Sequence, residues 1–279
     1  MRILVTGCEG QLGKAVIEEL RRRGHQVTGT SRRDMDITKW ENVERVFEAV
    51  KPEAAIHCAA YTNVDMAEEE EVYCREVNVQ GTAHILEGCR KYQARLLFIS
   101  SDYVFSGEKE EPYFENDSGE PVNVYGQSKL DAENLVRKYE KSFIVRTSWV
   151  FGEGRNFVQA ILRKAEKESK LSVVSDQIGS PTYTKDLAIL LADMVVTERY
   201  GIYHATNEGV CTWYEFAGEI LRQAGSRVEV LPIKTSEYPT KAKRPRNSQL
   251  GKRNLDKAGF ARLPIWKDAL KRYIDDFYK

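Results

Sequence analysis

A tyrosine and a lysine lie four residues apart in the middle of the chain, at Tyr125 and Lys129. Residues at this spacing share one face of a helix, so the ammonium would lie beside the phenol and lower its pKa from about 10. Such a phenol can exchange a proton with an oxygen at neutral pH. On its own, a Tyr–Lys pair at this spacing usually lies on a solvated helix face and has no function. The pair becomes informative because Ser100 and Ser101 stand at the end of the preceding apolar run. Open α/β sheets bind ligands at the carboxyl ends of their strands, so a serine hydroxyl there could hydrogen-bond a substrate carbonyl.

Three glycines, Gly7, Gly10 and Gly13, form Gly-x-x-Gly-x-x-Gly directly after the first apolar run. A phosphate needs backbone N–H donors, the positive end of a helix and no Cβ in its way, and glycines in a strand-to-helix turn supply all three. The motif therefore predicts a dinucleotide site. A tight turn that serves packing alone is the alternative.

The end of the second apolar run indicates which dinucleotide would bind. An acidic residue about 20 positions beyond the glycines would bind a free ribose 2′-hydroxyl, whereas arginine accommodates a 2′-phosphate. Ser31, Arg32 and Arg33 stand at this point, and Asp34 and Asp36 come late for the first role. The pattern favours NADPH, with NADH as the other donor; a solvated basic loop is the alternative interpretation.

Alternating strands and helices would position these groups. Strands are expected at residues 3–6, 26–30, 54–57, 96–100 and 142–146, and helices at residues 11–23, 40–50, 72–92 and 124–139. Apolar, β-branched strands between amphipathic helices predict an α/β fold with a doubly wound, Rossmann-type parallel sheet.

Beyond about residue 150 the pattern loosens and predicts a second domain. Further helices are expected at residues 156–169, 184–197, 213–224 and 265–278, and strands at 171–174, 201–205 and 228–231. We expect residues 1–150 to form the dinucleotide-binding domain, with residues 176–200 returning to it. Residues 151–175 and 201–279 would form a smaller, partly interleaved C-terminal α/β substrate-binding domain. The basic stretch 234–252 is a long loop of the kind that is more often functional than idle.

Composition excludes several classes of protein. The 279 residues include 42 Lys and Arg against 42 Asp and Glu, which argues against a general nucleic-acid binder. No apolar run is long enough to cross a bilayer, and no signal peptide is recognisable. Five cysteines without a Cys-x-x-Cys motif indicate reduced thiols in a cytoplasmic protein and no zinc site.

Taken together, the motifs resemble a known family. The glycine motif, the strand-end serine and Tyr-x-x-x-Lys resemble those of the extended short-chain dehydrogenase/reductases. Finer matches, at residues 57–65, 101–105, 123–126, 146–152, 176–182 and 244–250, resemble the dTDP-4-dehydrorhamnose reductase family over nearly the whole chain.

The resemblance implies NADPH-dependent reduction of the C4 ketone of dTDP-4-dehydro-β-L-rhamnose to dTDP-β-L-rhamnose, a step in nucleotide-sugar and cell-surface polysaccharide biosynthesis. In this family's mechanism Tyr125 would donate the proton and Ser101 would orient the oxygen. Lys129 would lower the tyrosine pKa and hold the nicotinamide ribose. Related sugar-nucleotide dehydratases place Asp-Glu after the strand-end hydroxyl, whereas this chain has Asp102 and Tyr103, which argues against elimination.

Two sets of binding residues follow from the motifs and the resemblance. The cofactor-binding set is Gly7, Glu9, Gly10, Gln11, Leu12, Gly13, Ser31, Arg32, Arg33, Asp36, Ile37, Cys58, Ala59, Ala60, Tyr61, Asn78, Ser100, Tyr125 and Lys129. The substrate-binding set is Thr62, Val64, Asp65, Ser101, Asp102, Tyr103, Trp149, Phe151, Asn156, Arg244 and Asn247. In the basic loop, Arg244 would pair with the diphosphate and Asn247 would supply neutral donors.

Several of these residues have a second interpretation. Trp149 and Phe151 could wall the sugar ring or belong to a buried aromatic core. Asp65 could contact substrate or cap the following helix. The basic loop could close over the diphosphate or be merely solvated. The four carboxylates at residues 68–71 are typical of a solvated helix face.

The remaining expectations concern partners and rival functions. The partner is a small-molecule nucleotide sugar, with neither nucleic acid nor membrane, and a homodimer is compatible with the sequence. Some family members carry Mg²⁺ at a subunit contact, but no oxygen-ligand pattern indicates one here. One rival is another extended short-chain nucleotide-sugar ketoreductase or epimerase. The other is a non-catalytic NADP-binding regulatory subunit, against which the intact Ser101, Tyr125 and Lys129 argue.

Overall fold

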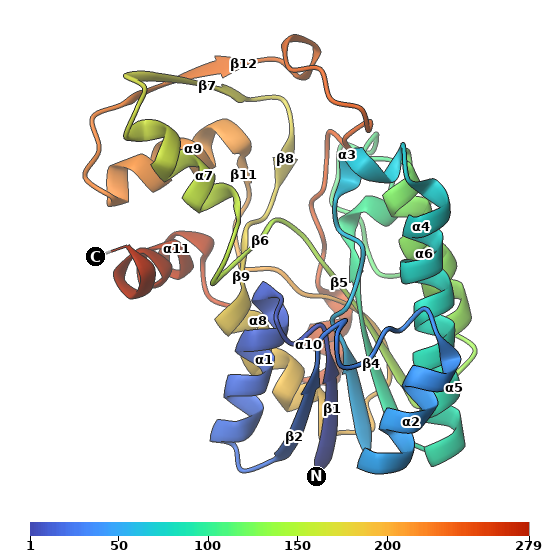
Figure 1. The fold of residues 1–279 in the computed structure, drawn as a ribbon. Helices are drawn as coiled ribbons and strands as arrows, with labels where there is room; N and C mark the ends of the chain where they lie inside the picture. Colours follow the sequence, from blue (N-terminus) through green and yellow to red (C-terminus); the bar gives the residue numbers. More distant parts are fainter. Residues whose placement is uncertain (279) are drawn as a thin grey trace.

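The central sheet has six parallel strands in the order β10-β5-β4-β3-β1-β2, in a computed structural model that describes residues 1–278 (Figure 1). These strands are β1 (Arg2–Thr6), β2 (Gln26–Thr30), β3 (Ala54–His57), β4 (Arg95–Ser101), β5 (Ser142–Thr147) and β10 (Gly201–His204). Strand β1 pairs with β2 on one side and β3 on the other, so the strand order reverses beside it. Ligands of open α/β sheets bind at such a reversal. The predicted fold class is confirmed.

Helices cover both faces of this sheet. One face is covered by α1 (Gln11–Arg22) and α8 (Thr184–Val195), and the other by α2 (Trp40–Val50), α5 (Gly81–Tyr92) and α6 (Val124–Val136) (Figure 1). Strand β1 shows how the sequence produces two cores, because successive side chains of a strand point to opposite faces. Ile3 and Val5 pack with α1 and α8, whereas Leu4 packs with α2 and α5.

The helix expected at residues 72–92 changes its winding in the middle. It begins as α4 (Glu71–Arg75), continues as the π-helical segment η1 (Glu76–Gln80) and becomes α5. Asn78 lies in η1, where its side chain accepts a hydrogen bond from the Tyr61 N–H at 2.8 Å and donates one to Ser128 Oγ at 2.9 Å. Apolar spacing alone did not indicate the wider turn, which occurs where this buried amide joins two other segments.

A smaller unit lies beyond the carboxyl edge of the sheet (Figure 1). It contains α7 (Phe157–Ala165), α9 (Trp213–Gln223), α11 (Trp266–Phe277) and the paired strands β6 (Val150–Phe151) with β9 (Thr182–Tyr183), β8 (Ile178–Gly179) with β11 (Cys211–Thr212), and β7 (Lys170–Val174) with β12 (Glu229–Ile233). Short helices α3 (Val64–Ala67), α10 (Arg253–Ala258), η2 (Asp102–Val104) and η3 (Thr235–Glu237) complete the described chain. Within residues 1–278, no helix has the length and apolar character of a membrane span.

The observed topology differs from the expected domain limits. Strand β10 pairs with β5 at the edge of the central sheet, and Leu255 and Phe260 join the core of that sheet. Helix α8 packs on α1, but β8 and β9 before it pair with strands of the smaller unit. We therefore propose that the larger domain consists of residues 1–148, 184–204 and 253–263. Local apolar patterns identify a strand but not the sheet that it joins.

A buried ion pair fixes α6 to the sheet. Glu133 of α6 and Arg146 of β5 are both fully buried, and two hydrogen bonds of 2.7 and 2.9 Å join them. Ser100 Oγ donates to the same carboxylate at 2.6 Å. Burial alone would raise the pKa of Glu133, but the hydrogen bonds and charge of Arg146 hold it below its usual value.

We expect Glu133→Gln to lower the free energy of unfolding by about 3–5 kcal/mol, because Arg146 would remain buried without its counter-charge. Urea unfolding measures this loss. Lys170→Ala is the control, since it removes an exposed ion pair with Glu229 and should cost less than about 1 kcal/mol. Equal losses in the two variants would contradict a special role for the buried pair.

Candidate active site

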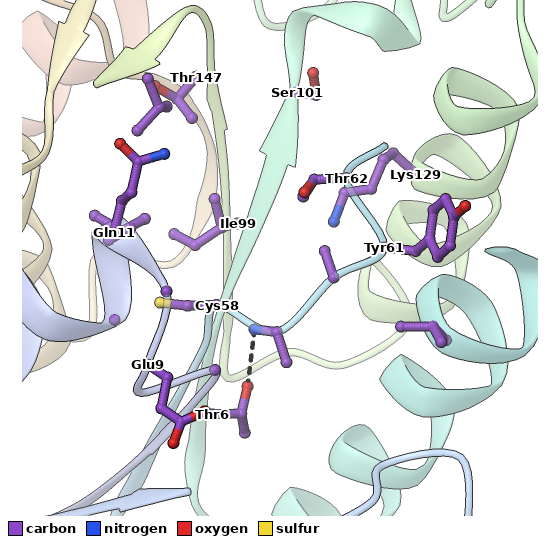
Figure 2. Close-up of a pocket in the computed structure, with 18 of the residues that line it drawn as sticks. Thr6, Glu9, Gln11, Cys58, Tyr61, Thr62, Ile99, Ser101, Lys129 and Thr147 are labelled. Carbon is purple, nitrogen blue, oxygen red and sulfur yellow. Dashed lines mark hydrogen bonds between the residues drawn. The ribbon is translucent and has the colours of Figure 1, made fainter. Parts of the chain in front are cut away.

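One cavity of about 900 Å³ collects most of the predicted site residues. It lies at the carboxyl edge of the sheet beside the reversal of strand order, and Trp149 and Trp213 line it from the side of the smaller unit. Its volume suits a small-molecule ligand. Figure 2 shows its walls, with Thr6, Cys58 and Ser101 from the strand ends and Lys129 from α6.

The glycine turn brings backbone unusually close to backbone. Gly7 has φ +68°, a conformation that favours glycine, and a Cβ on Gly13 would lie 2.1 Å from the Gly7 carbonyl oxygen. Packing therefore requires these two glycines. Helix α1 begins after Gly10 without a side-chain cap, and the first turn, with Gln11 and Leu12, lines the cavity. Its amino end is suited to a phosphate, so the turn has a packing role and leaves room for an anion.

The residues after β2 divide between the cavity and the solvent. Ser31 and Arg32 line the cavity, as do Asp36 and Ile37, whereas the neighbouring Arg33 is exposed and lies outside the lining. The Arg32 guanidinium lies 5.5 Å from the centre of the Tyr73 ring, a cation–π contact that holds the charge at the rim.

Asp34 lies in the same turn but outside the cavity lining. Its carboxylate accepts hydrogen bonds from the N–H of Ser31 at 2.8 Å and from the hydroxyl at 2.7 Å. These bonds hold the pKa of Asp34 below its usual value. Of the two arginines in this turn, Arg32 is therefore the one that lines the cavity.

The loop after β3 forms another wall. Cys58, Ala59, Ala60 and Tyr61 line the cavity, and the Ala59 N–H donates to Thr6 Oγ1 at 3.1 Å (Figure 2). Asn78 does not line the cavity. Its side chain accepts a hydrogen bond from the Tyr61 N–H and donates one to Ser128 of α6, and so connects this loop to α6.

Ser101, Tyr125 and Lys129 line the same cavity, the serine from the end of β4 and the other two from α6. Ser101 lies near enough to the Tyr125 phenol to counter part of the rise in its pKa. Lys129 extends toward the space between Ser101 and the Tyr61 loop (Figure 2), and its ammonium lies 4.2 Å from the centre of the Phe98 ring. The three groups predicted for proton transfer therefore meet at one place.

Burial governs the titration of this group. It lowers the pKa of Lys129 to about 8 and raises the pKa of Tyr125, and the nearby Ser101 opposes only part of the rise at Tyr125. The lowering of the Tyr125 pKa that we expected from Lys129 is not found, because burial dominates and the ammonium is not among the groups that shift it.

Three residues of the expected substrate set have other contacts. Phe151 is 1% exposed and packs in an aromatic cluster of the smaller unit, which is the alternative that the sequence left open. Asn156 caps α7 by accepting the N–H of Gln159 at 3.0 Å. The Asn247 amide donates to the carbonyls of Lys109, Glu110 and Glu111 and so braces the basic loop. A donor already used in this way is not available to a diphosphate.

The basic loop is tied to the acidic segment around α3. Arg244 forms an ion pair with Asp65 at 2.8 Å, and Asp65 also accepts the Ala242 N–H at 3.1 Å. Lys241 pairs with Glu69. Neither Arg244 nor Asp65 lines the cavity, whereas Thr62 and Val64 beside them do. The acidic run is therefore bound to the loop and is more than a solvated helix face.

Other cavity residues lie outside both expected sets. Trp213, at the start of α9, stacks on Trp149 with ring centres 3.6 Å apart. Lys14, Glu153 and Arg155 add charges to the lining. Thr212 caps α9 through a capping box with Glu215, but no local pattern indicated that Trp213 reaches the cavity. Within residues 1–278, no group of three or more His, Cys, Asp and Glu residues is arranged to hold a metal ion.

A parallel α/β sheet with a glycine turn at its strand reversal, and with serine, tyrosine and lysine at its carboxyl edge, defines an extended short-chain dehydrogenase/reductase. Comparison with known proteins narrows this class. The sequence model of the RmlD substrate binding domain family matches residues 1–279. The chain belongs to this family, that of the dTDP-4-dehydrorhamnose reductases, as its motifs predicted.

Similar proteins cover nearly the whole chain. A spore coat polysaccharide biosynthesis protein, SpsK, of Bacillus subtilis is 39% identical over 99% of this chain and 97% of its own. The dTDP-4-dehydrorhamnose reductase of Aggregatibacter actinomycetemcomitans is 40% identical over 97% of both chains. The crystal structure of the Bacillus anthracis dTDP-4-dehydrorhamnose reductase in complex with NADP has a TM-score of 0.96 and 39% identity over 99% of both chains.

The two arginines after β2 provide a matched pair of variants. We expect Arg32→Ala to weaken NADPH binding roughly ten- to hundred-fold, the worth of one charge-assisted contact of about 1.5–3 kcal/mol, and to change NADH binding little. Arg33→Ala should affect neither, because its side chain lies outside the cavity lining. Titration of both nucleotides measures the difference, and equal losses for NADPH and NADH in Arg32→Ala would assign the choice of cofactor elsewhere.

Proposed function

We propose that this protein reduces the C4 ketone of dTDP-4-dehydro-β-L-rhamnose to dTDP-β-L-rhamnose with NADPH. The observation that carries the proposal is the convergence of Ser101, Tyr125 and Lys129 on one cavity with the glycine turn. Family membership supports this choice of substrate and cofactor. A relative that is 40% identical is named dTDP-4-dehydrorhamnose reductase, and a dTDP-4-dehydrorhamnose reductase that is 39% identical has been crystallised in complex with NADP.

A bound nicotinamide cofactor supplies hydride transfer to a carbonyl carbon. The phenol of Tyr125 is the acid for the carbonyl oxygen, since burial keeps it protonated. Ser101 orients that oxygen by a hydrogen bond. Lys129 keeps a positive charge in the cavity at neutral pH, as its pKa of about 8 requires, and stabilises negative charge that develops on the oxygen. Trp149 and Trp213 wall the cavity beside the smaller unit and exclude water.

The rival functions are less well supported. Elimination needs its own acid–base pair, and Asp102 is followed by Tyr103 instead of a second carboxylate. A purely regulatory subunit would not need Ser101, Tyr125 and Lys129 arranged in one cavity. Homodimer formation and a cytoplasmic location remain predictions from the sequence, which does not indicate a Mg²⁺ site.

The proposed activity is tested by incubating the protein with NADPH and dTDP-4-dehydro-β-L-rhamnose and following the absorbance of the reduced nicotinamide. We expect Tyr125→Phe to fold and bind NADPH normally and to lower kcat by about 10²–10⁴, the usual worth of a positioned acid. An unchanged kcat would remove Tyr125 from the mechanism. Turnover of a different nucleotide sugar, and not of this one, would favour the rival ketoreductase.

The ion pair of the basic loop gives a second test of the substrate site. We propose that Arg244 exchanges Asp65 for the substrate diphosphate, because both offer paired anionic oxygens. Arg244→Ala should then raise KM for the nucleotide sugar about tenfold or more and leave NADPH affinity unchanged. Lys241→Ala, which removes the neighbouring ion pair with Glu69, is the matched control and should change KM little. A loss of NADPH affinity with an unchanged KM would assign the loop to the cofactor.

A further inference from the structure

Several buried polar atoms around the cavity have no hydrogen-bond partner within residues 1–278. Six buried side-chain nitrogen and oxygen atoms of this part of the chain have none, and four of the six belong to residues that line the cavity, namely Gln11, Thr30, Asp102 and Thr147. A buried polar atom without a partner costs free energy, so native proteins keep few of them. Their concentration around one cavity indicates that a ligand supplies the missing partners.

Thr147 is the member of this group whose position in the sheet relates it most directly to the proposed chemistry. It ends β5, is 5% exposed, and its Oγ1 has no hydrogen-bond partner among the described residues. In the parallel register of β4 and β5 it stands opposite Ser101. Neighbouring strands lie about 4.8 Å apart, so Thr147 is the immediate neighbour of the serine that orients the substrate oxygen. Neither expected set of binding residues includes it.

Thr147 faces the part of the cavity that α1 borders. Side chains alternate along a strand, and Val145, two residues earlier, packs in the core with α1 and α8. Thr147 therefore points to the same face of the sheet as α1. In Figure 2 it lies on the side from which Gln11 of α1 enters the cavity, whereas Thr62 and Lys129 lie on the other side. Since Thr62 leads into α3 and the basic loop, this placement favours a contact with the cofactor over one with the nucleotide sugar.

A buried neutral hydroxyl at this place suits the carboxamide of a nicotinamide ring. Hydride transfer requires the ring to lie about 3–3.5 Å from the carbonyl carbon, which places it against the strand ends that carry Ser101 and Thr147. The phosphates of the cofactor are anions and are matched by the amino end of α1. The carboxamide is the polar substituent of the ring, and it offers both a donor and an acceptor, as a hydroxyl does.

We propose that the Thr147 hydroxyl hydrogen-bonds the carboxamide of the bound nicotinamide and fixes the orientation of the ring, an inference that rests on the proposed reductase function. A ring held at its ribose alone can turn about its glycosidic bond. A hydrogen bond at the carboxamide removes this freedom, so that one face of the ring is presented to the carbonyl beside Ser101 and Tyr125. Thr147 is thus a cofactor-binding residue.

Thr147→Val tests this hydrogen bond, because valine has the shape of threonine without the hydroxyl. We expect it to weaken NADPH binding about three- to tenfold, the usual worth of one neutral hydrogen bond. Binding of 2′-phospho-ADP-ribose, which is NADPH without its nicotinamide, should remain unchanged. Thr147→Ser keeps the hydroxyl and should bind NADPH with nearly wild-type affinity. Fluorescence titration measures NADPH binding, and calorimetry measures binding of 2′-phospho-ADP-ribose.

Thr182→Val is the matched control. The Thr182 hydroxyl is also buried and without a hydrogen-bond partner among the described residues, but Thr182 does not line the cavity. This variant should bind both ligands as the wild type does. Thermal unfolding of the ligand-free proteins checks the fold. Neither valine substitution should lower Tm, because each removes a buried hydroxyl that has no partner.

Turnover gives an independent measure of the ring's orientation. Thr147→Val should lower kcat and leave KM for the nucleotide sugar near that of the wild type, because a misaligned ring slows hydride transfer without removing a substrate contact.

The outcomes separate the role of Thr147 from the proposed function. Unchanged NADPH affinity in Thr147→Val overturns the inference, and a raised KM would then make Thr147 a substrate contact. An equal loss for NADPH and 2′-phospho-ADP-ribose also overturns it, as does the same loss in Thr182→Val. A wild-type protein that binds NADPH but does not reduce dTDP-4-dehydro-β-L-rhamnose would instead reject the proposed function, while the binding measurements still decide the role of Thr147.

Discussion

The geometry of the active site depends on one buried charge pair, between Glu133 of α6 and Arg146 of β5. If α6 slid or rotated on the sheet, both charges would be left unpaired in the protein interior, which is energetically costly. The pair therefore fixes the position of α6. Ser100 stands opposite Arg146 in the β4–β5 register and donates to the same carboxylate. The position of Ser101 relative to the helix that carries Tyr125 and Lys129 is therefore set by backbone register.

A second constraint acts on the opposite side of the cavity. Because Gly13 lacks a Cβ, α1 begins in contact with the turn that follows β1, and because Gly7 lacks one, that turn packs against the loop after β3. This close approach leaves the amino end of α1 open to the cavity. Packing and anion binding, which the sequence presented as alternatives, thus have the same structural cause.

Charge complementarity links parts of the chain that are far apart in the sequence. Although the chain has no net charge, it contains an acidic segment around α3 and a basic loop near residue 244. The two are joined by the ion pairs Asp65–Arg244 and Glu69–Lys241. These pairs place the loop beside the cavity before any ligand is considered. They also mean that a diphosphate must compete with Asp65 for Arg244, so the affinity for substrate reflects a difference between two ion pairs.

The sequence by itself determined the strands of the sheet, the glycine turn, the Ser101, Tyr125 and Lys129 group and the family. These features follow from local residue spacing and apolar periodicity, which reflect the structure of a single strand, turn or helix. Only the tertiary structure decided that β10 joins the central sheet, that Phe151 belongs to a core, that Asn247 braces a loop and that Trp213 reaches the cavity. Each of these depends on contacts between residues distant in the chain. The same holds for the titration of Tyr125 and Lys129, because burial is a property of the packed molecule and not of a motif.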